Sequence, residues 1–141
     1  HPMLIHAMSR ARSLRLKPNL TCALIAIEDP AQTYEEPTRD GWLGVQRFQY
    51  APGTDACFQQ GDAQSVLQAV RRWQARGVED IVITDDSGQR ASVAICTVLG
   101  EAGVAEKTRL WDAHNSLLAD PDILGVMRLQ VNYKSPVQAT G

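Results

Sequence analysis

The sequence is poor in the residue types that mark several classes of protein. Its 141 residues include only three cysteines and carry a formal net charge of −2. An odd number of cysteines without framework spacing argues against a disulfide scaffold, and Cys22 and Cys96 lie in apolar runs typical of reduced core residues. The small net charge gives no sign of a nucleic-acid or membrane partner. Because no apolar run is long enough to span a membrane and no signal peptide is recognisable, we expect a soluble protein of the cytoplasm.

The chain does contain enough apolar residues for one hydrophobic core. Apolar residues make up 44% of it and charged residues 21%, which is the balance of an ordinary globular domain. The length suits one sheet with helices packed on it, so we predict a single domain over residues 3–132. The residues that follow, 133–141, are predicted to form a C-terminal tail.

Apolar and polar residues alternate in patterns that predict both strands and helices. Near-continuous apolar runs at 20–27 and 78–83 are typical of strands buried on both faces of a sheet. Further strands are predicted at 3–8 and 42–50, with a loop at 31–41. The alternation predicts an α/β fold, a three-layer sandwich with a central, largely parallel sheet flanked by helices.

Five helices are predicted from caps and from helical spacing of apolar residues. The first is short, is capped by Ser9 and turns Leu14 and Leu16 inward. The second is capped by Asp62 and ends at Gly77, and the third covers 90–99. The fourth starts near residue 105 and holds Leu110, Trp111, Leu117 and Leu118, and the last follows Asp120-Pro121.

The most specific signal in the chain is the segment Ile81-Val-Ile-Thr-Asp-Asp-Ser-Gly-Gln-Arg-Ala-Ser-Val-Ala-Ile95. An apolar strand breaks there into a polar loop, and a helix of small residues then begins. Such a junction points backbone N–H groups and the positive end of a helix dipole at one place, which suits an anion. The candidate ligand-binding residues are Asp85, Asp86, Ser87, Gly88, Gln89, Arg90 and Ser92.

In shape and flanking residues, this segment resembles the signature loop of the dual-specificity and tyrosine phosphatase-like family. That signature is an apolar strand, His-Cys, five residues that include a glycine, Arg-Ser and a helix of small residues. Gly88 and Ser92 fall in register with it. Counterparts also exist for the turn that ends at Pro30, for the Phe48 strand and for the helix start at Asp120. The resemblance covers roughly residues 3–132 and implies a phosphatase-like fold.

The groups that give this family its chemistry are replaced. Thr84 stands at the position of the histidine, Asp85 at that of the nucleophilic cysteine and Ala91 at that of the arginine, while Arg90 lies one position early. In the family a thiolate attacks phosphorus and an arginine binds the phosphate oxygens, but no cysteine here is followed six positions later by arginine. A carboxylate at position 85 would also repel a phosphate dianion. The resemblance therefore implies a pseudophosphatase without a catalytic residue.

The pair Asp85-Asp86 leaves other interpretations open. Two carboxylates at the carboxyl end of a parallel strand can hold Mg²⁺ for metal-assisted phosphoryl transfer or hydrolysis. Alternatively, they accept hydrogen bonds from loop N–H groups or cap the following helix. Asp55 is the nearby candidate for the family's general acid, and its position is also that of a turn residue. We interpret His6 as a core or edge residue of a strand, and we expect no catalytic role for His114.

The function predicted from the sequence is binding. A catalytically inactive phosphatase-like domain would recognise an unidentified protein partner or a ligand through its altered loop, with no cofactor and no metal ion. One alternative is an enzyme that uses Asp85 and Asp86 in metal-assisted phosphoryl transfer or hydrolysis. Another is a structural subunit of a homo-oligomer or of a larger assembly, in which Tyr34, Trp42 or Trp111 supply contact area.

The sequence also makes a prediction about architecture that coordinates can test. The runs at 20–27 and 81–83 should be buried parallel neighbours in one sheet, and the helix that starts near Arg90 should pack on this sheet. A helical conformation of either run, or its location at an exposed edge, would contradict the phosphatase-like fold.

Overall fold

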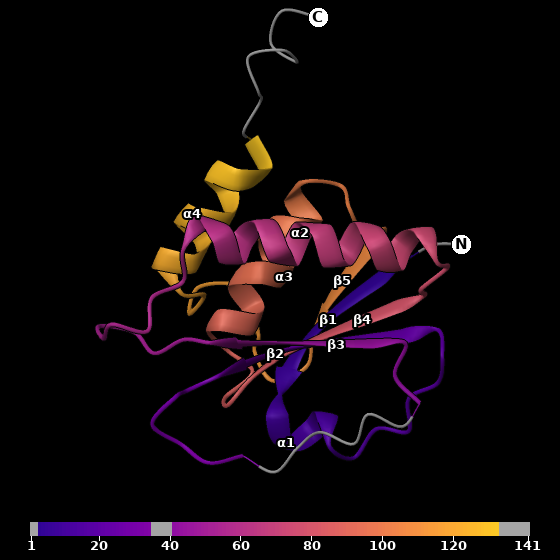
Figure 1. Cartoon of the computed structure of the whole chain (residues 1–141), viewed down its shortest axis with the longest axis horizontal. Coiled ribbons are helices and arrows are strands. Elements are labelled where there is room, and N and C mark those ends of the chain that lie inside the picture. Colours follow the sequence, from indigo (N-terminus) through magenta and orange to yellow (C-terminus); the bar gives the residue numbers. More distant parts are fainter. Residues whose placement is uncertain (1–2, 35–40, 133–141) are drawn as a thin grey trace, which may run out of the picture.

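The computed structural model describes residues 3–34 and 41–132, which form helical layers around one sheet (Figure 1). The predicted tail at 133–141 and residues 35–40 of the predicted loop lie outside the described residues. The strands are β1 (Leu4–Ser9), β2 (Cys22–Glu28), β3 (Gly44–Gln49), β4 (Asp80–Asp85) and β5 (Lys107–Leu110). They lie in the order β3-β2-β4-β1-β5, and each neighbouring pair is parallel. The predicted parallel sheet is therefore confirmed.

Strands β2 and β4 are direct neighbours inside the sheet, as the two apolar runs predicted. Ala23 lies opposite Ile81, and Ile25 lies opposite Ile83. All four side chains are completely buried, and Val82, on the other face of β4, is buried as well. A strand that is apolar on both faces buries the most apolar surface when both faces are covered. Such strands therefore lie in the interior of a parallel sheet.

Helices cover the two faces of this sheet unequally. α2 (Gln60–Ala75), α3 (Ala91–Glu101) and α4 (Pro121–Asn132) lie on one face, and the short α1 (Arg10–Ser13) lies on the other (Figure 1). The predicted three-layer sandwich is therefore confirmed. Among the described residues, no helix combines the length and apolar character needed to cross a membrane.

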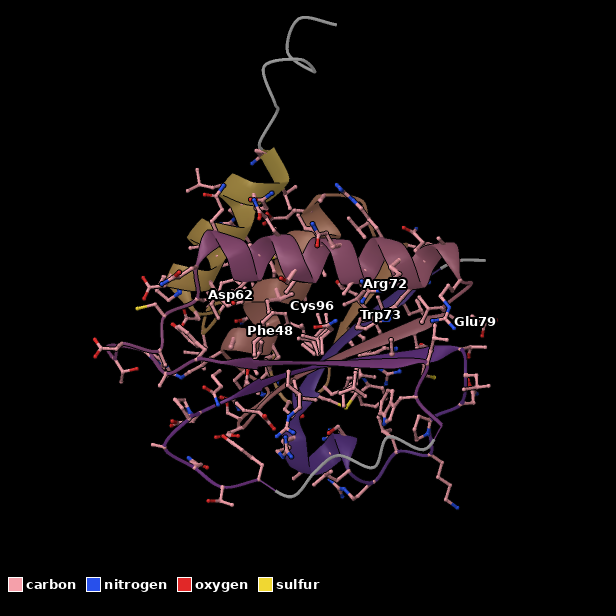
Figure 2. The ribbon with its side chains drawn as sticks, in the orientation of Figure 1. Phe48, Asp62, Arg72, Trp73, Glu79 and Cys96 are labelled. Carbon is pink, nitrogen blue, oxygen red and sulfur yellow. The ribbon has the colours of Figure 1, made fainter. Side chains whose placement is uncertain are left out.

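The larger hydrophobic core lies between the sheet and its three long helices. Figure 2 shows Phe48, Trp73 and Cys96 gathered in this layer. Gly44 lets the Trp73 ring pack directly against β3. A Cβ atom at this position would lie only 2.5 Å from Nε1 of Trp73. A smaller apolar cluster on the face of α1 consists of Met8, Leu24, Trp42 and Val82.

Polar residues fix the ends of α1 and α2, with one correction to the predicted caps. The Ser9 hydroxyl accepts a hydrogen bond from Arg12 N, so the first cap is confirmed. Asp62 is not the cap of α2, because the helix begins before it. Asp62 lies in the first turn of the helix instead. Its carboxylate accepts a hydrogen bond from the backbone N–H of Gln59, the capping residue, over 2.8 Å. Gly77, with φ of 84°, ends the helix as predicted.

The predicted helix that starts near residue 105 is wrong. Residues Lys107–Leu110 form β5, which pairs with β1, and Trp111 N continues the ladder by donating to Ala7 O. The open edge of β1 supplies backbone partners that local sequence cannot reveal, so tertiary pairing overrides the helical pattern. Leu117 and Leu118, assigned to the helix, are 86% and 52% exposed.

Two further details near the N-terminus are corrected. Leu14 and Leu16 do not turn inward but are 50% and 40% exposed, because α1 ends at Ser13 after a single turn. Leu20 is also exposed, and β2 begins only at Cys22. The apolar run at 20–27 therefore extends beyond the strand that it predicts.

The three cysteines occupy different environments. Cys57 is exposed, Cys22 is partly buried, and Cys96 is fully buried in α3. Burial raises the pKa of the Cys96 thiol to about 12, because a thiolate in this position would lose its hydration. The core position predicted for Cys96 is therefore confirmed, whereas Cys22, predicted to be a core residue as well, is only partly buried.

Thiol reactivity should follow this order of burial. At about pH 8, an aromatic disulfide reagent is expected to modify Cys57 first and Cys22 more slowly, and to reach Cys96 only after unfolding, because the thiolate is the reactive form. Absorbance of the released thiolate measures each phase. Cys57→Ser should remove the fast phase. Loss of the fast phase in Cys96→Ser would contradict the buried position of that thiol.

Candidate functional site

The loop singled out by the sequence lies at the carboxyl end of β4 and leads into α3. It borders a cavity of about 230 Å³ at the ends of the parallel strands. Asp85, Asp86, Ser87 and Arg90 line this cavity from the loop. Cavities at the carboxyl ends of parallel strands are the usual location of binding sites in open α/β sheets.

Asp85 is the last residue of β4, and its carboxylate is enclosed by the loop that follows. Oδ1 accepts hydrogen bonds from Gly88 N over 2.5 Å and from the Ser87 hydroxyl over 3.0 Å. Oδ2 accepts from Ser92 N over 2.7 Å and from Arg90 N over 3.3 Å. Asp85 is only 7% exposed. Its carboxylate thus occupies the place at which the loop N–H groups converge.

This arrangement agrees with one of the interpretations left open by the sequence. Asp85 does accept hydrogen bonds from loop N–H groups, including Ser92 N in the first turn of α3. A charged acceptor is favoured there because several donors and the positive end of the helix dipole meet at one place. The loop that was expected to receive an anion therefore holds a carboxylate of the same chain.

Gly88 permits the tight course of the loop. Its φ is 71°, a conformation that side chains with a Cβ atom rarely adopt. A Cβ atom at this position would lie 2.3 Å from Ser9 N and 2.6 Å from the carbonyl carbon of Met8. Only glycine lets the loop pack against the end of β1 while its N–H points at Asp85.

Ser92 places an unpaired polar group beside this carboxylate. Its backbone N–H binds Asp85, but its hydroxyl is completely buried and has no hydrogen-bond partner among the described residues. A buried hydroxyl without a partner costs roughly 1–3 kcal/mol of stability. The hydroxyl of Ser92 is therefore expected to lower the stability of the loop that its backbone N–H helps to build.

The other residues of the loop are less enclosed. Asp86 is exposed and accepts a hydrogen bond from the Tyr34 hydroxyl over 3.0 Å instead of from the loop N–H groups. Gln89 donates from its side chain to the backbone oxygen of Asp112. Arg90 is exposed at the cavity, and its backbone oxygen accepts from Asp120 N. The loop is thus joined to segments far apart in the sequence.

Tyr34 connects the loop after β2 to the loop after β4. Its hydroxyl accepts from Asp29 N over 2.9 Å while it donates to Asp86. The guanidinium carbon of Arg10 lies 4.4 Å from the centroid of the Tyr34 ring, a distance typical of cation–π contact. Partial burial raises the pKa of Tyr34, and the neighbouring Asp86 carboxylate adds to this effect. Tyr34 therefore remains a neutral hydrogen-bond donor to Asp86.

Two further acidic side chains of the cavity, those of Asp120 and Asp29, were not identified from the sequence. Asp120 caps α4 by accepting from the N–H groups of Asp122 and Ile123, and its other oxygen accepts from the Tyr50 hydroxyl over 2.6 Å. Burial and this carboxylate raise the pKa of Tyr50. Asp29 also lines the cavity. Tyr50 could have been placed at the cavity from the sequence, because it ends a predicted strand and the carboxyl ends of parallel strands lie at one edge of the sheet.

The lining of the cavity is acidic. Of the residues that the structure describes, four carboxylates, those of Asp29, Asp85, Asp86 and Asp120, line it together with one basic side chain, that of Arg90. Within 3–34 and 41–132, no group of three or more histidine, cysteine or acidic side chains is arranged to hold a metal ion. Asp55 and His114 are exposed, and neither is among the residues that line this cavity.

Comparisons of the chain with protein-family models, with curated proteins and with solved structures found no match.

The stability of the protein should depend on the carboxylate of Asp85. Asp85→Ala leaves three buried or partly buried N–H groups without their acceptor, so we expect a loss of about 2–4 kcal/mol in the free energy of unfolding. Asp85→Asn keeps one oxygen and the side-chain volume, and should lose less. Urea unfolding monitored by circular dichroism measures both losses.

Ser92→Ala provides the matched control for this measurement. It keeps the N–H that binds Asp85 and removes only the unpaired hydroxyl, so its unfolding free energy should equal or exceed that of the unaltered chain. A loss in Ser92→Ala as large as that in Asp85→Ala would show that the loop is sensitive to any change and that the carboxylate has no special part in it.

Proposed function

We propose that this chain is a catalytically inactive phosphatase-like domain that acts as a binding module for a protein or ligand partner. The hydrogen bonds of Asp85 carry the proposal. A loop that presents converging N–H groups suits an anionic ligand, and here the carboxylate of Asp85 already accepts those hydrogen bonds. The loop thus keeps the form of an anion-binding site while one of its own residues fills it.

The positions of the cysteines support the absence of thiol chemistry. A cysteine phosphatase needs a thiolate at the base of the loop, activated by N–H groups and a nearby cation. Cys96 is buried in α3 with a raised thiol pKa, whereas Cys57 and Cys22 belong to other segments. None of the three lines the cavity beside Asp85. The cavity therefore lacks a nucleophile of the required kind.

Charge also disfavours a phosphorylated ligand deep in the cavity. A phosphate about 4 Å from a single carboxylate experiences a repulsion of roughly 4 kcal/mol per pair of unit charges at an effective dielectric constant near 20. Arg90 offsets one such interaction, but the cavity carries four carboxylates. A partner is therefore recognised at the exposed rim, where Asp86, Ser87 and Arg90 lie.

The absence of turnover is the direct test of this proposal. The purified chain should not hydrolyse p-nitrophenyl phosphate above the buffer background, with or without added magnesium. Among the described residues, no cysteine lines the cavity and no cluster of acidic, histidine or cysteine side chains is arranged to hold a metal ion. Release of nitrophenolate measures the rate. Turnover that disappears in Asp85→Ala would overturn the proposal and favour an enzyme that uses Asp85 as base or ligand.

Sulfate binding tests whether Asp85 occupies the place of an anion. Asp85→Asn should bind sulfate at least about tenfold more tightly than the unaltered chain, a difference of about 1.4 kcal/mol, because it removes one negative charge among the loop N–H groups. Isothermal titration calorimetry at low salt measures both affinities.

Asp86→Asn is the matched control for the sulfate titration. It removes the same charge from the same cavity, but its carboxylate contacts Tyr34 and not the loop N–H groups. We expect a smaller gain than in Asp85→Asn. Equal gains in sulfate affinity in the two variants would mean that only the overall charge of the cavity matters. If the unaltered chain binds sulfate tightly and Asp85→Asn weakens this binding, the metal-assisted alternative is favoured.

A further inference from the structure

His6 lies on the face of the sheet that α1 covers, between two partners that use both nitrogens of its ring. Its Nε2 is 2.7 Å from Oδ1 of Asp80, and Trp111 Nε1 donates to its Nδ1 over 3.0 Å. The His6 side chain is only 13% exposed. Because an indole N–H can only donate and a carboxylate only accepts, the two contacts together require a neutral imidazole with its proton on Nε2.

Protonation of His6 affects these two contacts in opposite ways. An imidazolium carries a hydrogen on both nitrogens. The contact with Asp80 then becomes a charge-assisted hydrogen bond and strengthens. The contact with Trp111 is lost, because Nδ1–H and the indole N–H face each other as two donors.

We propose that His6 is a pH-sensitive switch for the indole of Trp111. Neutral His6 holds the indole through Nδ1, and protonated His6 releases it while remaining bound to Asp80. The inference stands on these contacts alone and is independent of the function proposed for the loop after β4.

The charged groups around the pair determine how far the indole can move. Arg109, on β5, lies with its guanidinium carbon 3.7 Å from the centroid of the indole, and the corresponding distance for Arg12, on α1, is 5.6 Å. Both cations contact the indole through its ring and not through its N–H, so they continue to hold it when His6 is charged. Among the described residues, Lys17 and Cys22 are the titratable groups besides His6 and Asp80 that line this cavity.

The backbone next to Trp111 is fixed independently of His6. Asp112 forms a two-point ion pair with Arg12 and accepts from Ser9 N over 2.8 Å. Arg12 holds the pKa of the Asp112 carboxyl below its usual range, and this pair keeps its charges when histidine gains one. The switch is therefore confined to the side chain of Trp111.

The movement has a structural consequence on this face of the sheet. Trp111 is one wall of a cavity of about 210 Å³, which Met8, Trp42 and Val82 also line. Loss of the hydrogen bond to His6 frees the N–H edge of the indole while the two cations still hold its ring, so this wall of the cavity can shift. Access to the cavity should therefore differ between neutral and mildly acidic solution.

Nuclear magnetic resonance of the indole N–H groups tests the switch. The chain has three tryptophans and so gives three indole signals, of which Trp111→Phe identifies one. In a titration from about pH 8 to about pH 5, we expect the Trp111 signal to move upfield when His6 gains its second ring proton, because the hydrogen bond of the indole N–H is then lost. It should follow the same titration curve as the His6 ring protons of the unaltered chain.

Two variants separate the switch from other effects of pH. His6→Gln should abolish the pH dependence of the Trp111 signal, whereas His114→Gln, at an exposed histidine, should leave it unchanged. A Trp111 signal that does not change over this range would overturn the proposal, as would a dependence that survives in His6→Gln. If His6→Gln does not fold, the two titration curves of the unaltered chain decide, and different midpoints would overturn the proposal.

Discussion

The loop between β4 and α3 depends on a negative charge that the protein supplies itself. Backbone N–H groups at the start of a helix need acceptors, and several of them point at one place here. Asp85 reaches this place from the last position of the strand, so one side chain satisfies the turn and the start of the helix together. The loop can therefore keep its form without a bound ligand.

The Asp85 carboxylate also helps to position α3 on the sheet. It ties the first turn of α3 to the end of β4, and Gly88 brings the loop against the end of β1. α3 is buried on nearly every side and packs over β1 and β4. The position of this apolar helix thus depends on a polar group at its beginning, since a misplaced first turn would shift the core contacts that follow.

Much of the fold could be predicted from local sequence, because its central strands are apolar on both faces and its longest helix has clear end signals. The loop after β4 could be located for the same reason, although the hydrogen bonds of Asp85 were one of several possibilities. Asp120 and Tyr50 were missed because they come from separate segments that only the sheet brings together. β5 was missed because its partner, β1, lies about 100 residues earlier in the chain.

The composition of β5 has a consequence for the association of the protein with itself. This strand forms one end of the sheet order, and Lys107, Thr108 and Arg109 are exposed on it. A second chain that tried to extend the sheet there would have to bring its backbone against two long cationic side chains. Charged residues at the border of a sheet discourage such strand-to-strand growth. The strand that sequence patterns failed to reveal therefore also carries charge that disfavours pairing with a second chain at this edge of the sheet.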